Sequence, residues 1–349
     1  MTASDRQFPK SSSPRGRTGR LAIVDMLRGF AIIAMVIYHL SWDLSWFGYV
    51  DWAVSTDPAW RGFAAAIAGS FLFLSGVSLR LAHGTGIRWT SFLRREAILV
   101  AAAAAVSLIT WTTFGPSMVR FGILHCMAVS SVMALVAVTR PPFMAFGLGA
   151  ALLALGFAPP VETLAGDLWL WTGLGVPDSD AVDYVPLIPW SGLVFLGLGL
   201  AGLLTGWLEQ TATGRRKALT ALDATAGASR PGRLLRLLGR KSLPIYLLHQ
   251  PLLYGTVWVI ALVFGAPDRD AIAFIDGCQA SCAATYGDAE ACRAACTCTQ
   301  SDMDGRGAWA RLVEQPEDPV LREDLNTTYA SCLRQTPPAG LLPPAAQSD

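Results

Sequence analysis

Seven long apolar runs dominate this chain of 349 residues and decide what it can fold into. Each run approaches the roughly 20 apolar residues that a helix needs to cross the hydrocarbon core of a bilayer. The runs cover Leu21–Phe47, Gly62–Leu81, Ala97–Phe114, Phe121–Val138, Phe143–Ala158, Trp190–Leu208 and Ser242–Phe264. Only 15% of the residues are charged, against about 25% in soluble proteins. We therefore predict an all-α integral membrane protein with about seven transmembrane helices and exclude a soluble globular domain.

Cationic residues in the short connections predict the orientation of these helices. One side of the membrane receives 18 Lys and Arg residues, whereas the opposite short loops hold two, Arg61 and Arg120. Cytoplasmic loops carry the excess of Lys and Arg, so the N-terminus is predicted to be cytoplasmic. After seven crossings the C-terminal tail is extracytoplasmic. The predicted location is the inner (plasma) membrane, multi-pass, with membrane lipid as a direct partner.

Charge divides the chain into two parts. The part up to Pro267 carries 21 basic and 13 acidic residues, net +8, and the part from Asp268 carries 6 basic and 13 acidic residues, net −7. Membrane topology accounts for this division, so nucleic-acid binding is not required. We expect a disordered cytoplasmic leader (1–20), a transmembrane domain (21–266), a cysteine-rich extracytoplasmic domain (267–335) and a disordered tail (336–349).

The first apolar run contains four ionisable residues, Asp25, Arg28, His39 and Asp43. Eleven helical steps of about 100° return to within about 20° of the start, so these residues form one stripe facing protein. Such residues are costly inside a membrane and mark functional candidates. Asp25 and Arg28 form either a structural ion pair or part of a substrate channel. His39 and Asp43 form either an interfacial polar pair or a general base oriented by a carboxylate.

Two further histidines, His125 and His249, lie within apolar runs. A histidine satisfied inside the core is the simpler interpretation of each one. The alternative places both with Asp25 along a substrate channel.

Five segments, in this order, resemble bacterial relatives of the heparan-α-glucosaminide N-acetyltransferase catalytic domain. They are RLAIVDMLRGFAIIAMVIYHLSWDL, FLFLSGVSL, RFGILHCMA, DYVPLIPWSGLVFLGLGLA and LGRKSLPIYLLHQPLL. The resemblance covers about Arg20–Val263. The spacing of Arg28 and His39 is also similar to an Arg-x10-His motif of bacterial membrane O-acyltransferases. The resemblance implies that an acyl group moves from cytoplasmic acetyl-CoA to an extracytoplasmic sugar or glycan.

Individual roles follow from the resemblance and from residue chemistry. His39 is expected to act as general base, or as a transient acyl carrier, with Asp43 orienting it. Residues expected to hold acetyl-CoA are Arg28, Arg94, Arg95, Arg240, Lys241, Ser242 and Tyr246, the arginines and the lysine through its phosphates. The lysosomal enzyme has an amide where this chain has His39 and has more spans. The resemblance therefore leaves the acceptor and the choice between N- and O-acylation open. A homodimer is possible.

Two other function classes compete with an enzyme. A transporter or permease would use Asp25, Arg28 and His39 as a proton or solute pathway. The chain has no internal repeat, which counts against the inverted-repeat transporters. The third class is a membrane anchor whose cysteine-rich tail binds a partner.

Six of the seven cysteines lie in the tail. Cys278 and Cys282, like Cys292 and Cys296, are one helical turn apart, as in a helical hairpin. Antiparallel helices would pair Cys278 with Cys296 and Cys282 with Cys292, with Gly287 in the turn 285–290. Cys298 and Cys332 remain for a third disulfide. Zinc is the alternative, but the tail contains no histidine, so no metal is predicted.

Overall fold

The computed structural model describes residues 21–164, 166, 168–175, 181–210, 217, 221, 223, 225 and 228–338. The predicted leader 1–20 and most of the predicted tail 336–349 lie outside the described residues. The described chain is helical and contains no strand, which confirms the predicted all-α class. The chain forms two compact units. The first unit contains the residues up to Leu40 and Ala53–Leu253, and the second contains Ser41–Trp52 and the residues from Tyr254 onward. The domain limits at 266 and 335 stay predictions.

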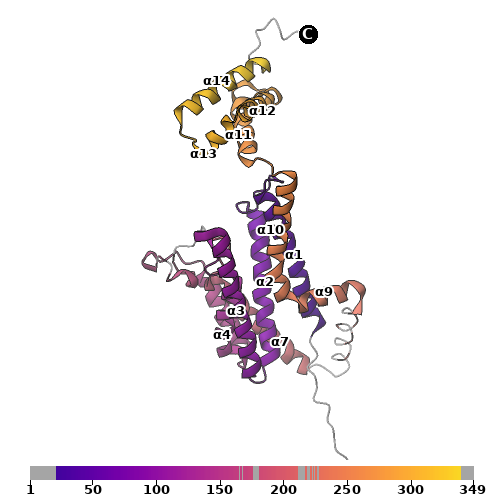
Figure 1. Cartoon of the computed structure of the whole chain (residues 1–349). Helices are drawn as coiled ribbons and strands as arrows, with labels where there is room; N and C mark the ends of the chain where they lie inside the picture. Colours follow the sequence, from indigo (N-terminus) through magenta and orange to yellow (C-terminus); the bar gives the residue numbers. More distant parts are fainter. Residues whose placement is uncertain are drawn as a thin grey trace, which may run out of the picture. The chain divides into compact units, whose positions relative to one another are not determined.

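The first unit is built on long apolar helices (Figure 1). In chain order the helices of the membrane part are α1 (Ala22–Trp46), α2 (Pro58–His83), α3 (Trp89–Phe114), α4 (Ile123–Met133), α5 (Leu135–Val138), α6 (Pro142–Leu155), α7 (Leu187–Gln210), α9 (Arg230–Arg240) and α10 (Ser242–Phe264). The described connections contain the short 3-10 turns η1 (Gly115–Ser117), η2 (Glu162–Leu164) and η3 (Leu170–Thr172). α1 and α10 reproduce two of the predicted spans to within about one residue at each end.

Five described helices are long and apolar enough to cross a bilayer: α1, α2, α3, α7 and α10. The protein is therefore a multi-pass membrane protein. The other two predicted spans are shorter apolar helices, α4 with α5 and α6. The α4 segment is interrupted at Ala134, and α6 begins after Pro141 and gives way to a turn at Gly156. The count of seven crossings and the orientation of the chain stay predictions.

Helix α7 forms the centre of the first unit because glycines let its neighbours approach closely. A side chain at Gly76 on α2 would overlap the backbone carbonyl of Val194 on α7, and one at Gly197 would overlap Phe73. On the other side of α7, a Cβ at Gly149 of α6 would lie 3.0 Å from the carbonyl oxygen of Gly192. Small residues at helix crossings are typical of membrane proteins, where packing rather than water drives association.

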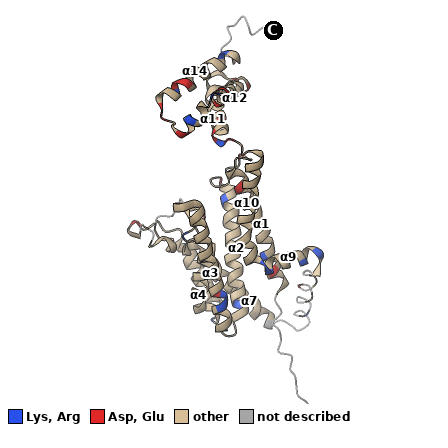
Figure 2. Cartoon of the chain, viewed as in Figure 1, with Lys and Arg blue, Asp and Glu red and all other residues tan. Residues whose placement is uncertain are grey.

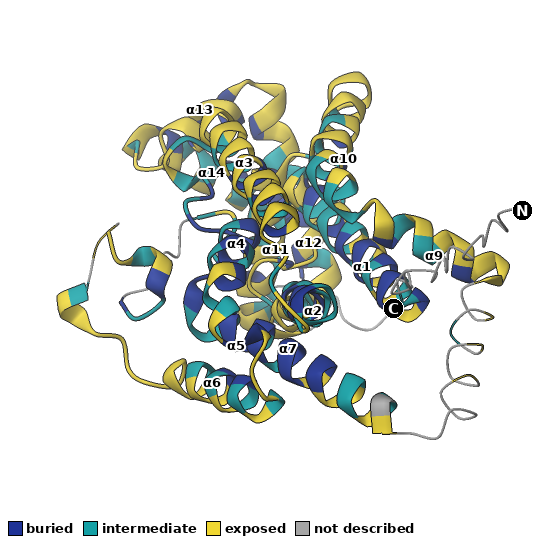
Figure 3. Ribbon diagram, turned by 90° about the horizontal axis from the view of Figure 1, so that it is seen from below, coloured by how far each residue is buried: buried dark blue, intermediate teal, exposed yellow. Residues whose placement is uncertain are grey.

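Outer helix surfaces carry exposed apolar side chains. α3 and α10 are the least buried of the five candidate spans, and α7 is the most buried. Figure 3 shows this difference as exposed residues along α3 and α10 and buried ones on α7. In a membrane these exposed faces contact lipid. Figure 2 shows that the long helices are uncharged over most of their length, whereas charges gather in α9 and in α11–α14.

The second unit is larger than the predicted hairpin. It contains α11 (Arg269–Tyr286), α12 (Ala289–Gly305), α13 (Ala308–Glu314) and α14 (Pro319–Gln335). The disulfides pair Cys278 with Cys296, Cys282 with Cys292 and Cys298 with Cys332, which confirms the predicted pairs. Gly287, in the left-handed conformation at φ 73°, ends α11 at the predicted turn.

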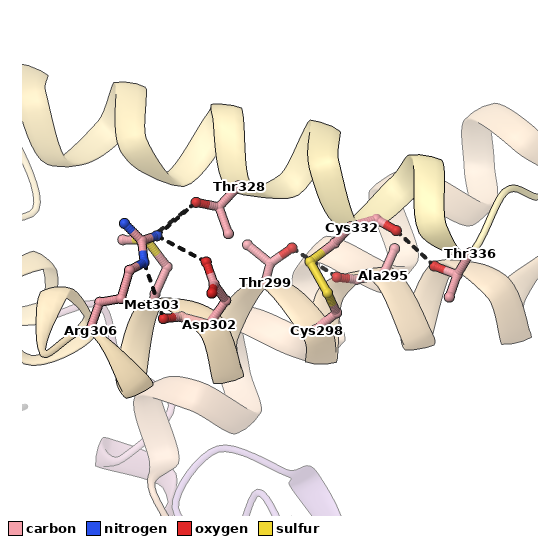
Figure 4. Close-up of a disulfide and its surroundings, with 9 residues drawn as sticks. All are labelled: Ala295, Cys298, Thr299, Asp302, Met303, Arg306, Thr328, Cys332 and Thr336. Carbon is pink, nitrogen blue, oxygen red and sulfur yellow. Dashed lines mark hydrogen bonds and ion pairs between the residues drawn. A yellow bond between two sulfur atoms is a disulfide. The ribbon is translucent and has the colours of Figure 1, made fainter.

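Two helices that the sequence did not predict complete this second unit. α13 and α14 cover a small core of Ala271, Met303, Ala308, Trp309, Leu312 and Leu321. The Cys298–Cys332 disulfide joins α12 to α14, and the Arg306 guanidinium donates to Thr328 on α14 (Figure 4). Arg306 also donates to Asp324 of α14. The predicted hairpin rests on the spacing of four cysteines in α11 and α12. α13 and α14 join it through contacts with α12 and through the Cys298–Cys332 disulfide.

Candidate functional site

The polar stripe of α1 begins at a helix end that a distant carboxylate caps. Asp223 accepts hydrogen bonds from the backbone amides of Ala22 at 2.9 Å and Ile23 at 2.8 Å. These amides belong to the first turn, which has no partners within its own helix. A side chain about 200 positions along the chain therefore fixes where α1 starts.

Asp25 forms the predicted ion pair at the start of α1, and a second arginine joins it. Its carboxylate lies 3.8 Å from Arg28 and 3.2 Å from Nε of Arg240 on α9. The Asp25 side chain is 6% exposed, so this ion pair is screened less than a surface pair. One carboxylate faces two guanidinium groups, which leaves this end of the site cationic.

Arg28 and Arg95 reach α2 from two different helices. Arg28 on α1 donates to the Ser78 hydroxyl, and Arg95 on α3 donates to Ser75 at 2.9 Å. Arg95 also donates to Ser131 of α4 at 3.3 Å. Because Ser75 and Ser78 are one helical turn apart, the two cations lie on neighbouring turns of α2. The Ser75 and Ser78 hydroxyls are neutral, so these hydrogen bonds do not neutralise the two guanidinium charges.

The remaining residues predicted to hold acetyl-CoA are arranged differently from Arg28 and Arg95. Arg94 is exposed on α3, in contrast to the inward-facing Arg95. Lys241 is exposed at the end of α9, and Ser242 is the first residue of α10. Tyr246 lies further along α10, in the apolar interior and beside the histidines described next.

Two histidine rings meet inside the first unit. The ring centroids of His39 on α1 and His249 on α10 are 4.8 Å apart, with an edge-to-face angle of 62°. Tyr38 lies 5.4 Å from His39, and Tyr246 lies 5.7 Å from His249. His249 is only 8% exposed. The sequence singled out both histidines separately, and the fold brings them together.

Asp43 and His125 are the two remaining residues predicted at the site. Asp43 is fully buried one helical turn after His39 on α1, and its orienting role stays a prediction.

His125 uses both ring nitrogens at the start of α4. Its Nδ1 accepts from the Gly122 amide at 3.3 Å, and its Nε2 lies 3.3 Å from the Ser107 hydroxyl. These bonds hold the connection between α3 and α4, which supports the simpler interpretation of His125. Its channel role stays a prediction.

Sequence reasoning missed Asp183, in the loop before α7. Its Oδ2 accepts from the Ile123 amide at 3.3 Å, and its charge acts on the hydroxyl groups of Tyr38 and Tyr246. Burial raises the pKa of Asp183 to about 6, although the bond from Ile123 favours the ionised form. Asp183 opens the DYVPLIPWSG segment, so that segment held the signal. Ser75 and Ser78 likewise lie in FLFLSGVSL.

Within the described ranges, no group of three or more His, Cys, Asp or Glu side chains is arranged to hold a metal ion. The ionisable side chains at the site carry imidazole, carboxylate and guanidinium groups.

Comparison with known protein families gives a match to the membrane part of the chain. Residues 20–251 match the family described as heparan-alpha-glucosaminide N-acetyltransferase, catalytic. The chain belongs to this family. Membership identifies a membrane transferase of the acetyltransferase type. The match contains the paired histidines and the arginines at Ser75 and Ser78, and it ends before α11–α14. No curated protein matches the chain, and no solved structure matches it.

Proposed function

We propose that this protein moves an acetyl group from cytoplasmic acetyl-CoA to an extracytoplasmic sugar or glycan, with His39 as the general base. Membership of the N-acetyltransferase family supports the reaction class. The assignment of the site rests on His39 and His249, whose rings lie 4.8 Å apart in the interior of the first unit.

The donor would bind from the side where Arg28 and Arg95 meet α2. Acetyl-CoA carries phosphates at one end and the thioester at the other, so it needs a cationic site well separated from the reacting atoms. Arg28 and His39 are eleven residues apart on α1, which is about 16 Å along a helix. That separation is comparable to the extended pantetheine arm. Arg240, paired with Asp25, lies beside the same end and would extend the cationic surface.

His39 would take the proton from the acceptor hydroxyl or amine while that atom attacks the acetyl carbonyl. Asp43, one turn further on, would hold the imidazole in the productive tautomer. Asp25, His125 and His249 would line the path between donor and acceptor sites.

Reconstituted vesicles test this proposal. Purified protein receives radiolabelled acetyl-CoA on one side and a glucosaminide on the other, and the labelled product is counted. An N-acetylated glucosaminide, which offers only hydroxyl groups, separates O- from N-acylation. We expect labelled sugar only with acetyl-CoA on the cytoplasmic side, and its loss in His39→Ala. Movement of unlabelled, unmodified sugar across the membrane would instead support a permease, and wild-type turnover in His39→Ala would remove His39 from the chemistry.

A further inference from the structure

His249 differs from the other buried histidines in how its ring nitrogens are used. Its Nδ1 lies 2.7 Å from the backbone carbonyl oxygen of Tyr246, three residues earlier on α10. A carbonyl oxygen only accepts hydrogen bonds, so Nδ1 must carry the proton and donate it. In neutral imidazole the second nitrogen then holds a lone pair. The helix backbone thus fixes the tautomer of His249 with Nε2 as the basic atom.

This basic nitrogen is buried and has no hydrogen-bond partner among the described residues. The whole residue is 8% exposed, so bulk water does not satisfy Nε2 either. A buried acceptor without a partner lowers stability, and in native structures it calls for a functional explanation. His125 makes a clear contrast, because the structure gives each of its two ring nitrogens a polar neighbour.

The unpartnered Nε2 belongs to the ring that contacts His39. With the centroids 4.8 Å apart and the rings edge to face, a nitrogen of one ring can come within hydrogen-bond reach of the other, directly or through one water molecule. Tyr38 on α1 lies against His39, and Tyr246 on α10 lies against His249. Asp183 acts on both tyrosines, and Asp43 follows His39 by one turn of α1.

We propose that His249 Nε2 receives the proton that His39 removes from the acceptor and delivers it to the departing thiolate of coenzyme A. This inference rests on the proposed acetyl transfer. The bond between acceptor atom and hydrogen breaks as the bond from that atom to the acetyl carbon forms. The carbon–sulfur bond of the thioester breaks with its electron pair on sulfur. The proton passes from His39 to His249 and then to sulfur, so free thiol leaves and both imidazoles return to their starting state.

A comparison of two donors tests this proton path. Acetyl-CoA has an alkyl thiolate leaving group that benefits from protonation. The acetyl ester of 4-nitrothiophenol releases a stable thiolate that needs no proton. We expect His249→Asn to slow transfer to a glucosaminide from acetyl-CoA by about 100-fold, within the usual contribution of proton transfer. With the aryl thioester the same variant should lose less than about 5-fold, whereas His39→Ala should be equally slow with both donors.

Asparagine is the informative substitution because its amide NH2 can still donate to the Tyr246 carbonyl while the basic nitrogen is lost. Should His249→Asn fail to fold, His249→Gln, which puts an amide near the Nε2 position, is measured with the same two donors. The matched control is His83→Asn. His83 is a 3% exposed histidine whose Nδ1 accepts from the Arg88 amide. Turnover per folded His83→Asn protein should stay within about 2-fold of wild type, because His83 is the last residue of α2 and takes no part in the proposed proton path.

The possible outcomes separate the two proposals. Equal losses with both donors, or wild-type turnover of His249→Asn with acetyl-CoA, would overturn the proton path while leaving acetyl transfer intact. Wild-type protein that acetylates nothing from either donor would overturn the proposed function, and the proton path with it.

Discussion

Gly239 of α9 lies directly against the backbone of Asp25 on α1. A side chain at Gly239 would overlap the Asp25 carbonyl oxygen, and one at Gly29 of α1 would overlap the carbonyl oxygen of Leu235 on α9. Both obstacles are backbone atoms, which cannot rotate away as a flexible side chain can. This crossing brings Arg240 to the Asp25 carboxylate and holds the basic helix α9 beside the start of the polar stripe.

The first prediction concerns this crossing. Gly239→Ala should destabilise the protein by about 1–3 kcal/mol, because overpacking forces the two backbones apart. Thermal unfolding in detergent measures the loss, and faster tryptic cleavage at the arginines of α9 reports its release. Gly255→Ala on α10 is the control, since a Cβ there has no atom within 4 Å. Equal stability of Gly239→Ala and wild type would contradict the close crossing.

The second prediction concerns the donor site. Arg95→Lys keeps the charge but puts one ammonium nitrogen in place of the two guanidinium nitrogens that donate separately to Ser131 and Ser75. The KM for acetyl-CoA should rise about 10-fold, equivalent to about 1.4 kcal/mol, because a point charge replaces the planar guanidinium expected to hold the phosphates. Arg88→Gln, at an exposed arginine before α3, is the control and should leave that KM within about 2-fold. An unchanged KM in Arg95→Lys would remove Arg95 from donor binding.

The third prediction is a pH dependence of stability that arises from Asp183. Its pKa is raised from 3.8 to about 6 in the folded protein. The protonated form therefore stabilises the fold below about pH 4, and this contribution disappears as the pH rises through 6. The difference in unfolding free energy between pH 4 and pH 7 should be at most about 3 kcal/mol from this group.

Asp183→Asn should abolish that part of the pH dependence, because an amide does not titrate in this range. Its carbonyl oxygen can still accept from the Ile123 amide, so the start of α4 keeps its partner. Unfolding midpoints at pH 4, 5, 6 and 7 provide the measurement, and the variant should be the more stable protein at pH 7. If the unfolding midpoints of variant and wild type changed with pH in parallel, the pKa of Asp183 would not be raised in the folded protein.

The fourth prediction concerns the three disulfides of α11–α14. Mass spectrometry of non-reduced peptides should recover Cys278–Cys296, Cys282–Cys292 and Cys298–Cys332. Replacing Cys298 and Cys332 with serine should cost about 4 kcal/mol, and replacing Cys282 and Cys292 about 3 kcal/mol, because sequence separations of 34 and 10 close loops of different length. Acetyl transfer should persist in both variants, since the family match ends at residue 251. Free thiols at these positions would contradict the pairing.

The fifth prediction concerns orientation. Reporter fusions at the N-terminus should be cytoplasmic and fusions after Ala266 extracytoplasmic, because 18 cationic residues lie on one side and two on the other. A cytoplasmic reporter after Ala266 would mean an even number of crossings. In that case one of the shorter helices, Ile123–Met133 or Pro142–Leu155, does not span the bilayer.

Local spacing determined much of this protein from the sequence alone. The lengths of the apolar runs fixed the candidate spans, since a helix rises about 1.5 Å per residue against a bilayer of set thickness. The same periodicity put Asp25, Arg28 and His39 on one stripe and put the cysteines of α11 and α12 on facing turns. Each of these relationships lies within one helix or one tight hairpin, so backbone geometry is sufficient to predict it.

Contacts between distant helices were decided only by the tertiary structure. The approach of His39 to His249, the two arginines on Ser75 and Ser78, and the capping of α1 by Asp223 all join segments far apart in the sequence. Which faces meet depends on glycine crossings such as Gly239 on Asp25 and Gly76 on Val194. Two close-packed backbones set the rotation of both helices about their axes, and no periodicity within a single segment carries that information.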